Sequence, residues 1–208
     1  MTNPLLDGYR KFRAETWPAE RARYEALSRK GQRPETLVVA CSDSRVDPAT
    51  VFGAVPGELF VVRNVAGLVP PYQPDAAYHG TSAALEFGVR VLGVKRIVVL
   101  GHAQCGGVRA MVEGAPAEAR DFVEPWMGMA ASVMRHDHDH DHDHDDPSSR
   151  LTHYETEVVR LSLANLRTFP WIAEAEVAGT LELIGYRFDI HTGMLTVLTE
   201  QGFVPIEV

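Results

Sequence analysis

Two short apolar runs rich in β-branched residues, Thr36–Ala40 and Arg96–Leu100, constrain the fold of this chain most strongly. Runs of this kind are typical of strands that are buried on both faces of a parallel sheet. Each run leads directly into a short polar segment that contains a cysteine. In an open α/β sheet, the carboxyl ends of the parallel strands face the crevice where ligands bind. We therefore expect the two polar segments to meet at one edge of the sheet.

Potential metal ligands stand in both segments: Cys41 in the first, and His102 and Cys105 in the second. Two thiolates and one imidazole leave a fourth position open, as in a catalytic zinc site. A disulfide between the only two cysteines is the alternative, but a reducing compartment disfavours it and the His-x-x-Cys spacing favours a metal. Three other histidines show no ligand spacing and are interpreted as structural or surface residues: His79, His153 and His191.

Strand and helix patterns alternate along the first half of the chain, which predicts right-handed βαβ crossovers. The predicted fold class is α/β, a single domain over residues 1–208. It has a mostly parallel central sheet with flanking helices, an N-terminal helical arm (about 1–31) and a C-terminal antiparallel edge hairpin. The other elements expected in this half are a short helix from Asp47-Pro48 to about Phe52, a strand at Glu58–Arg63, and helices at Ala76–Leu92 and Gly106–Glu113.

The N-terminal arm carries apolar residues at helical spacing, namely Leu5, Tyr9 and Phe12. Pro18 is expected to open a second helix, because proline suits a first turn. An arm of this kind has little core of its own. It is expected to pack either on a neighbouring subunit or on its own domain, and the sequence leaves both alternatives open.

The second half of the chain is predicted to contain helices at Ala117–Arg135 and Leu151–Phe169, then strands at Gly179–Ile190 and Met194–Leu198. Between the two helices, His136–Asp146 alternates histidine and aspartate. A run of this composition cannot bury apolar surface and is expected to be a flexible, solvated loop. It is interpreted as a neutral insertion, a zinc-capturing loop or a proton buffer near pH 7, and the neutral interpretation is preferred.

The charge and hydropathy of the chain limit its partners. The formal net charge is −8, which gives no support to nucleic-acid binding. The N-terminus lacks the apolar region of a signal peptide, and no apolar stretch approaches the ~20 residues of a membrane span. We therefore expect a cytoplasmic protein that contacts neither membrane nor nucleic acid.

Complete Cys-x-Asp-x-Arg and His-x-x-Cys motifs occupy residues 41–45 and 102–105, each after a predicted strand. Together with the flanking text Gly57–Val65 and Gly101–Gly107, they resemble the β-class carbonic anhydrases. The resemblance extends from about Gln32 to Glu113, and more weakly to the C-terminus. It implies the same α/β fold and a homodimer or homotetramer.

The resemblance also implies a zinc ion in each subunit, held by Cys41, His102 and Cys105, and the reversible hydration of CO₂ to bicarbonate and a proton. Zinc-bound hydroxide would be the nucleophile. Asp43 would accept a hydrogen bond from that hydroxide, and Arg45 would keep Asp43 ionised and off the metal. In a closed state, Asp43 would instead be the fourth ligand. The alternative for these two residues is a surface salt bridge of little value.

By the same resemblance, Phe60, Val65 and Phe87 line the CO₂ pocket, and Gln32 reaches in from the partner subunit. From its spacing alone, Phe87 is simply a core residue of a helix. The helix N-terminus at Gly106-Gly107 offers backbone N–H groups to bicarbonate, and glycine allows a close approach of the backbone.

Some members of the family close when bicarbonate binds a second pocket built from Trp, Arg and Tyr. The corresponding residues here are Val38, Arg63 and Phe188, so two of the three donors are absent. We therefore expect bicarbonate not to close this protein. Two other functions stay open: the same zinc chemistry on another heterocumulene (carbon disulfide or carbonyl sulfide), and a non-catalytic zinc-binding protein.

Overall fold

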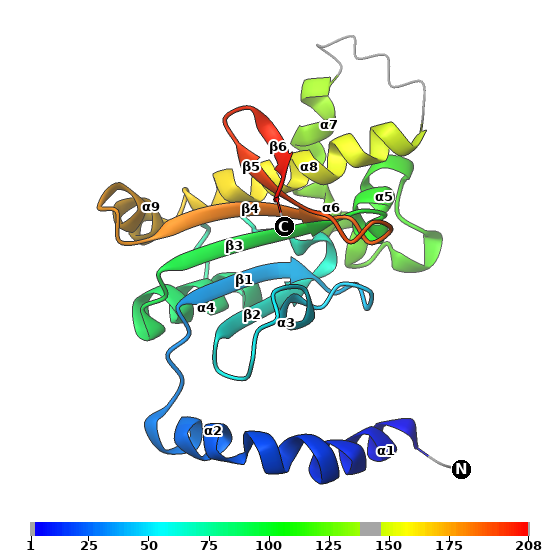
Figure 1. Ribbon diagram of the computed structural model, residues 1–208. Helices are drawn as coiled ribbons and strands as arrows, with labels where there is room; N and C mark the ends of the chain where they lie inside the picture. Colours follow the sequence, from blue (N-terminus) through cyan, green and yellow to red (C-terminus); the bar gives the residue numbers. More distant parts are fainter. Residues whose placement is uncertain (1–2, 138–146, 208) are drawn as a thin grey trace.

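The computed structural model describes residues 3–137 and 147–207. One six-stranded sheet has the strand order β2-β1-β3-β4-β5-β6 (Figure 1). Strands β2, β1, β3 and β4 are parallel, and β5 and β6 continue the sheet in antiparallel pairing. The strands are β1 (Thr36–Cys41), β2 (Leu59–Asn64), β3 (Arg96–His102), β4 (Glu182–Phe188), β5 (Leu195–Thr199) and β6 (Gly202–Pro205). The predicted fold class is confirmed.

Helices connect the parallel strands and cover the sheet (Figure 1). Segments η1 and η3 are π-helical, and η2 and η4 are 3₁₀ turns. In chain order, the helical segments are α1 (Pro4–Lys11), η1 (Phe12–Thr16), α2 (Trp17–Lys30), α3 (Pro48–Val51), η2 (Val65–Gly67), α4 (Gly80–Glu86), η3 (Phe87–Leu92), α5 (Gly106–Glu113), η4 (Ala117–Ala119), α6 (Val123–Gly128), α7 (Ala131–Asp137), α8 (Pro147–Leu166) and α9 (Pro170–Val177).

The site-bearing strands form where the sequence predicts them. In both β1 and β3, every residue after the first is buried. Asp47 caps α3 by accepting a hydrogen bond from the Thr50 backbone N–H at 2.9 Å, and Pro48 occupies the first helical position. Because the chain leaves β1 toward β2 on one side and returns through β3 on the other, the carboxyl ends of β1 and β3 form a topological switch point, the usual place of a binding site in such sheets.

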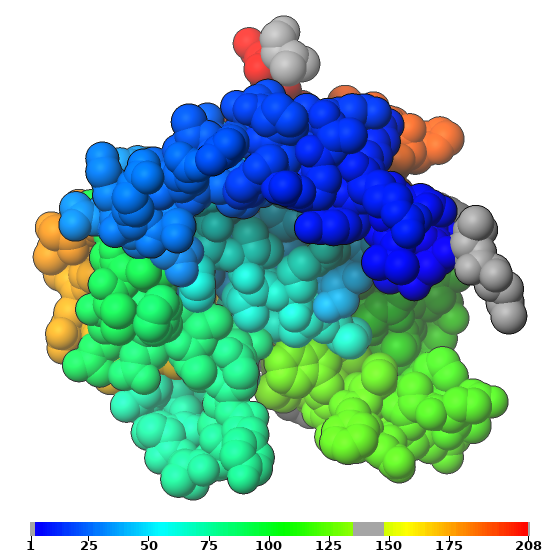
Figure 2. Space-filling view, turned by 90° about the horizontal axis from the view of Figure 1, so that it is seen from below, coloured from blue at the N-terminus to red at the C-terminus, as the bar shows by residue number. Residues whose placement is uncertain are grey.

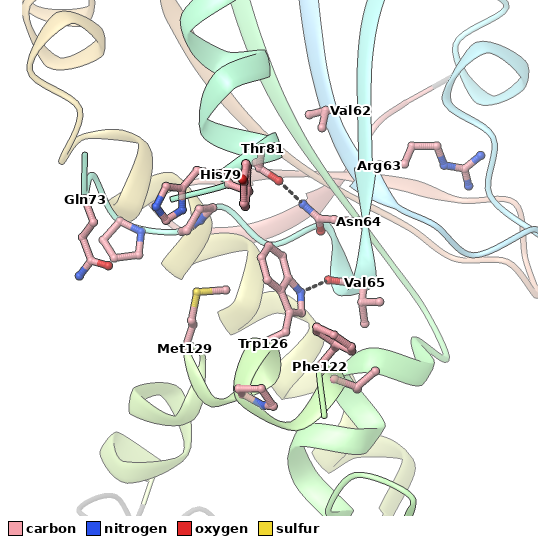
Figure 3. Close-up of a pocket in the computed structure, with 16 residues that line it drawn as sticks. Val62, Arg63, Asn64, Val65, Gln73, His79, Thr81, Phe122, Trp126 and Met129 are labelled. Carbon is pink, nitrogen blue, oxygen red and sulfur yellow. Dashed lines mark hydrogen bonds between the residues drawn. The ribbon is translucent and has the colours of Figure 1, made fainter. Parts of the chain in front are cut away.

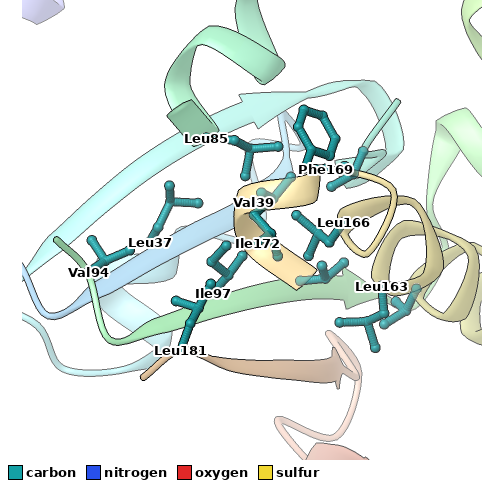
Figure 4. Close-up of a cluster of buried hydrophobic side chains, with 13 residues drawn as sticks. Leu37, Val39, Leu85, Val94, Ile97, Leu163, Leu166, Phe169, Ile172 and Leu181 are labelled. Carbon is teal, nitrogen blue, oxygen red and sulfur yellow. The ribbon is translucent and has the colours of Figure 1, made fainter. Parts of the chain in front are cut away.

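The core lies mainly on one face of the sheet, under α4, α8 and α9 (Figure 4). Residues 37 and 39 of β1, and 97 and 99 of β3, point into it, while 38, 40, 98 and 100 point to the opposite face. This alternation follows from the two-residue period of a strand. The largest fully buried side chains include Phe169, Leu37, Leu85, Ile97, Leu166 and Ile172.

Several element boundaries differ from the predictions. The crossover helix begins at Gly80 instead of Ala76, because Ala76 has a φ of +64° and the Asp75 side chain takes the Ala77 N–H. The helix expected at Ala117–Arg135 is divided into η4, α6 and α7, and α6 ends at Gly128. Strand β6 was not predicted. Helix α7 extends through Asp137, while residues 138–146 of the predicted flexible insert lie outside the described residues.

The N-terminal arm (α1, η1 and α2) is set apart from the sheet, beyond α3 and β2, and crosses the face shown in Figure 2. None of its described residues is buried, and Leu5 is 83% exposed. Near its C-terminal end, the Leu27 side chain packs against Gly57. The apolar stripe of the arm is therefore not part of the core of its own chain. No helix in the described residues is long and apolar enough to span a bilayer.

Candidate metal centre

Three potential ligands meet at the carboxyl ends of β1 and β3. Cys41 is the last residue of β1, His102 is the last residue of β3, and Cys105 is the N-cap of α5. One ligand atom from each lies within 4.8 Å of the other two, and all three residues are buried. No other group of three such residues within the described ranges could hold a metal ion. His79, His153 and His191 are therefore not in such a cluster.

The two sulfur atoms are spaced as metal ligands. Cys41 Sγ and Cys105 Sγ are 3.9 Å apart and both cysteines are free, so the alternative of a disulfide is wrong. Two thiolates bound to one tetrahedral zinc ion at about 2.3 Å would lie about 3.8 Å apart. The distance between the sulfur atoms therefore fits a metal ion without rearrangement.

His102 has the tautomer that a metal ligand needs. Its Nδ1 lies 2.8 Å from the Ala103 carbonyl oxygen, which can only accept, so Nδ1 carries the proton. Its Nε2 is left with a lone pair. Nε2 is also the only buried side-chain polar atom without a hydrogen-bond partner in the described part of the chain. Such atoms are rare, and a metal ion would supply the missing partner.

The contact between the two sulfur atoms shifts the pKa values of the two thiols in opposite directions. A hydrogen bond from Cys105 lowers the pKa of Cys41, with a further contribution from His102. The same contact and burial raise the pKa of Cys105. Metal binding must therefore release a proton from this pair, as is usual for thiolate ligands.

Asp43 and Arg45 form a bidentate pair beside this cluster. Arg45 Nε donates to Asp43 Oδ1 at 2.9 Å, and Arg45 Nη2 donates to Asp43 Oδ2 at 2.6 Å. These hydrogen bonds hold the pKa of the Asp43 carboxyl well below its usual range. Asp43 Oδ2 lies 3.9 Å from His102 Nε2, and the Asp43 side chain is only 14% exposed. Asp43 thus lies against the ligand cluster, whereas the Arg45 side chain is 51% exposed and holds the carboxylate from the solvent side.

This chain is similar to known proteins in both sequence and architecture. The family model for carbonic anhydrase matches residues 36–195. A carbonic anhydrase of Pseudomonas aeruginosa is 37% identical over 194 residues, which is 93% of this chain and 86% of that protein. The structure of the β-carbonic anhydrase CcaA superposes with a TM-score of 0.90 at 31% identity, covering 99% of this chain and 92% of the other. The chain belongs to the β-carbonic anhydrase family.

Other solved β-carbonic anhydrases give the same result. A tetrameric β-carbonic anhydrase of Sordaria macrospora has a TM-score of 0.81 and 28% identity, with 98% of this chain and 97% of the other covered. The Coccomyxa β-carbonic anhydrase in complex with acetazolamide has a TM-score of 0.77 and 28% identity, with 98% and 87% covered. The resemblance found in the motifs is thus confirmed over nearly the whole chain.

Two arginines fix the loops of this β-carbonic anhydrase site. Arg45 Nη2 also donates to the Gln104 carbonyl oxygen at 3.0 Å, which ties the segment after β1 to the segment after β3. Arg63 donates to three backbone carbonyl oxygens, those of Cys41 (2.9 Å), Asp43 (2.7 Å) and Val46 (2.7 Å). The loop that carries Asp43 is therefore held from both sides.

The residues predicted to line the CO₂ pocket lie in two places. Val65 follows β2 and packs against Gly107, beside the ligand segment. Phe60 pairs with Leu37 at the start of β1, whereas Asn64 pairs with Cys41 at its end. Phe60 therefore lies four residues, or about 13 Å, from the level of Cys41.

Phe87 and Gln32, which were also predicted to line the pocket, lie at the same end of the sheet as Phe60. The ring of Phe87 is 5.9 Å from that of Phe60, and Gln32 lies in the exposed link before β1. Within one chain, the structure does not bring Gln32, Phe60 and Phe87 together with Cys41.

A cavity of about 800 Å³ opens next to Val65 (Figure 3). Its walls are mostly apolar and include Val62, Phe122 and Trp126, whose Nε1 donates to the Val65 carbonyl oxygen at 2.8 Å. None of the three potential metal ligands lines it. The group that could hold a metal ion is therefore outside this cavity.

The two glycines that open α5 differ in their surroundings, and this gives a stability prediction. A Cβ atom at Gly107 would lie 2.7 Å from Val65 Cγ1 and 3.1 Å from the Ala66 backbone nitrogen, whereas one at Gly106 would meet nothing within 4 Å. We expect Gly107→Ala to lower the free energy of unfolding by about 1–3 kcal/mol, the usual cost of overpacking. Gly106→Ala is the matched control and should be close to neutral in urea denaturation. Equal stability of the two variants would contradict the packing role of Gly107.

Sequence reasoning missed Glu155 and Arg187, which are also close to the ligands. Glu155 on α8 accepts a hydrogen bond from the Cys105 backbone N–H at 3.1 Å. One sequence signal was available: a carboxylate stands between Leu151 and Val159, in the apolar stripe of a helix.

Proposed function

We propose that this β-carbonic anhydrase family member catalyses the zinc-dependent reversible hydration of CO₂ to bicarbonate and a proton. The observation that carries the proposal is the buried cluster of Cys41 Sγ, His102 Nε2 and Cys105 Sγ, with the ionised Asp43 beside it. Cysteine and histidine are preferred zinc ligands, and three protein ligands leave one position for water or substrate. When bound there, zinc would supply a Lewis acid that activates water at neutral pH.

Asp43 is proposed to orient the attacking water. A carboxylate that stays ionised can only accept hydrogen bonds, so Asp43 would hold the attacking water through a proton that this water still carries. Arg45 occupies both carboxylate oxygens and keeps Asp43 from becoming a fourth ligand. The proton released in each cycle must pass to buffer outside the site.

The substrate is proposed to bind near Val65 and the N-terminus of α5. CO₂ has no charge and no hydrogen-bond donor, so an apolar wall formed by Val65 suits it. Backbone N–H groups at Gly106-Gly107 would favour the bicarbonate anion. Since Gln32, Phe60 and Phe87 lie away from Cys41 in one chain, we propose that they act at the site of a second copy.

The proposal implies a homodimer or homotetramer in the cytoplasm. The exposed apolar stripe of the arm supports an assembly of copies, since Leu5 and Tyr9 are 83% and 58% exposed. The Sordaria macrospora relative is described as tetrameric. Light scattering of the purified chain would measure the oligomeric state, and a monomer would contradict the proposal.

A stopped-flow assay of CO₂ hydration on the zinc-loaded chain tests the proposed function. We expect buffered turnover that disappears when a strong chelator removes the zinc. Hydrolysis of carbon disulfide, measured in parallel, would favour the other heterocumulene reaction. A chain that binds one zinc ion tightly and turns over neither substrate would be a non-catalytic zinc protein.

We also predict that bicarbonate does not switch the protein off. Val38 is fully buried and packs in one cluster with Phe188, so neither offers a hydrogen-bond donor. Arg63 already donates to three backbone carbonyl oxygens. A bicarbonate ion buried there would lose hydrogen bonds to water, at a cost of about 1–3 kcal/mol for each unsatisfied group.

Turnover against pH, with and without added bicarbonate, measures this prediction. The expected result is a simple product inhibition, without cooperativity in the pH profile. A steep, cooperative loss of activity at mildly acidic pH that deepens with bicarbonate would show that a closed state forms without the second pocket.

A further inference from the structure

Helix α8 approaches β3 and β4 closely because two glycines leave it room. A Cβ atom at Gly101 would lie 2.6 Å from Val159 Cγ2. A Cβ atom at Gly185 would lie 3.0 Å from side-chain carbons of Val159 and Leu163. Any side chain at these strand positions would push the helix away. The close approach places Glu155, one turn before Val159, beside the segment that follows β3.

Glu155 is a buried carboxylate that joins three elements. It is only 3% exposed, and its Oε1 accepts the hydrogen bond from the Cys105 backbone N–H at 3.1 Å. Its Oε2 accepts from Arg187 Nη2 at 2.8 Å and from Arg187 Nε at 3.2 Å. Arg187 lies on β4, directly beside Gly101 on β3. The carboxylate therefore connects α8 and β4 to the segment that carries two of the three proposed ligands.

The hydrogen bond fixes the backbone of Cys105. Cys105 is 2% exposed and begins α5 without a side-chain cap of its own. A buried N–H without an acceptor is costly, so the peptide is held where Glu155 can accept from it. Negative charge is also favourable near a helix N-terminus. Because only one rotatable bond joins the backbone of cysteine to Sγ, a fixed peptide limits Sγ to a few staggered positions.

Arg187 compensates the buried charge of Glu155 and orients its carboxylate. The Arg187 side chain is 11% exposed, and both of its hydrogen bonds go to the same oxygen, which leaves Oε1 for Cys105. A buried ion pair contributes little stability compared with apolar residues of the same size. Its position next to a proposed ligand therefore points to a role in the site.

We propose that Glu155, held by Arg187, is a positioning residue that sets the direction of the Cys105 thiolate and thereby strengthens zinc binding. This inference rests on the proposed function, because it takes Cys105 to be a zinc ligand. Hydrogen-bond partners of metal ligands typically contribute about 10–100-fold to metal affinity. We therefore expect loss of the Glu155 hydrogen bond to weaken zinc binding and not to lower the stability of the fold.

Two double variants separate the effect of the hydrogen bond to the Cys105 N–H from the effect of the Glu155–Arg187 ion pair. Glu155→Gln/Arg187→Met and Glu155→Leu/Arg187→Met both remove the ion pair, but only glutamine keeps an acceptor for the Cys105 N–H. Zinc release from the full chain to a chromogenic chelator is measured after loosely bound metal has been removed. We expect the leucine variant to release zinc about 10–100-fold faster than the glutamine variant. Its cobalt-substituted form should also show a shifted thiolate-to-cobalt absorption band.

Equal release rates, within about twofold, and identical cobalt bands in the two double variants would overturn the inference. If the leucine variant does not fold by circular dichroism, Glu155→Asp decides the matter. It keeps the charge and Arg187 but has a shorter side chain, so zinc should leave faster than from the wild type. An unchanged rate in Glu155→Asp would overturn the inference as well.

Ser162→Ala is the matched control for α8. It removes another buried acceptor on the same helix, the one that takes the Val69 N–H at 3.2 Å, without touching a proposed ligand. We expect this variant to release zinc at the wild-type rate. Faster release would mean that any loosening of α8 speeds the loss of zinc, which would overturn the specific role of Glu155. A wild-type chain without tight zinc would overturn the proposed function and this inference together. Equal rates in a chain that binds zinc would overturn this inference alone.

Discussion

Cys105→Ala and His102→Ala are expected to lose the tight zinc ion and, with it, the hydration of CO₂. The binding free energy of zinc in four-ligand protein sites is about 10–16 kcal/mol, or roughly 3 kcal/mol for each ligand. Loss of one ligand should therefore weaken binding by about 100-fold or more. Metal content after dialysis against a mild chelator measures the effect, and the stopped-flow assay follows activity.

His191→Ala is the control for the histidine substitution. His191 lies in the exposed turn between β4 and β5, outside the ligand cluster, and should keep zinc and activity. Metal content is best compared in chains in which a Gly/Ser linker replaces residues 138–146, because a His/Asp-rich sequence can bind additional metal weakly. Full zinc retention in Cys105→Ala would show that the ligands are assigned wrongly.

Asp43→Ala is expected to keep the zinc ion and lose most of the catalytic activity. The carboxylate lies 3.9 Å from His102 Nε2 and is proposed to orient the attacking water. A positioned acid or base of this kind typically contributes about 10²–10⁴-fold to the rate, so kcat should fall by about 100-fold or more. Arg45→Ala should have a similar effect, because it leaves Asp43 free to reach the metal.

Asp47→Asn serves as the control for a neighbouring carboxylate. Asp47 caps α3, and asparagine caps helices equally well, so this variant should keep both zinc and turnover. Near-wild-type turnover in both Asp43→Ala and Arg45→Ala would remove the pair from the mechanism.

The pH dependence of the Asp43–Arg45 pair follows from the lowered pKa of Asp43, which its hydrogen bonds with Arg45 cause. A carboxyl group whose pKa is lower in the folded state stabilises the fold above its unfolded pKa of about 3.9. That contribution disappears as the pH falls through the lower, folded pKa. Asp43 should therefore stay ionised at all pH values above about 5, and any inflection of turnover in that range belongs to another group.

Local sequence determined the strands and the group of potential metal ligands. The β-branched runs that become β1 and β3 are buried on both faces, and burial of this kind is typical of strands in a parallel sheet. The parallel arrangement then forces the residues that follow both strands to one edge. That is why Cys41, His102 and Cys105 could be grouped, although 64 residues separate the two cysteines in the chain.

Only the tertiary structure decided which residues surround that group. Phe60 and Val65 are close in sequence, but the extended strand between them places Phe60 near the opposite end of the sheet. Glu155 meets Cys105 only because Gly101 and Gly185 allow α8 to approach the sheet. Contacts of this kind depend on strand register and helix packing, which arise from many distant residues at once and leave no local pattern in the sequence.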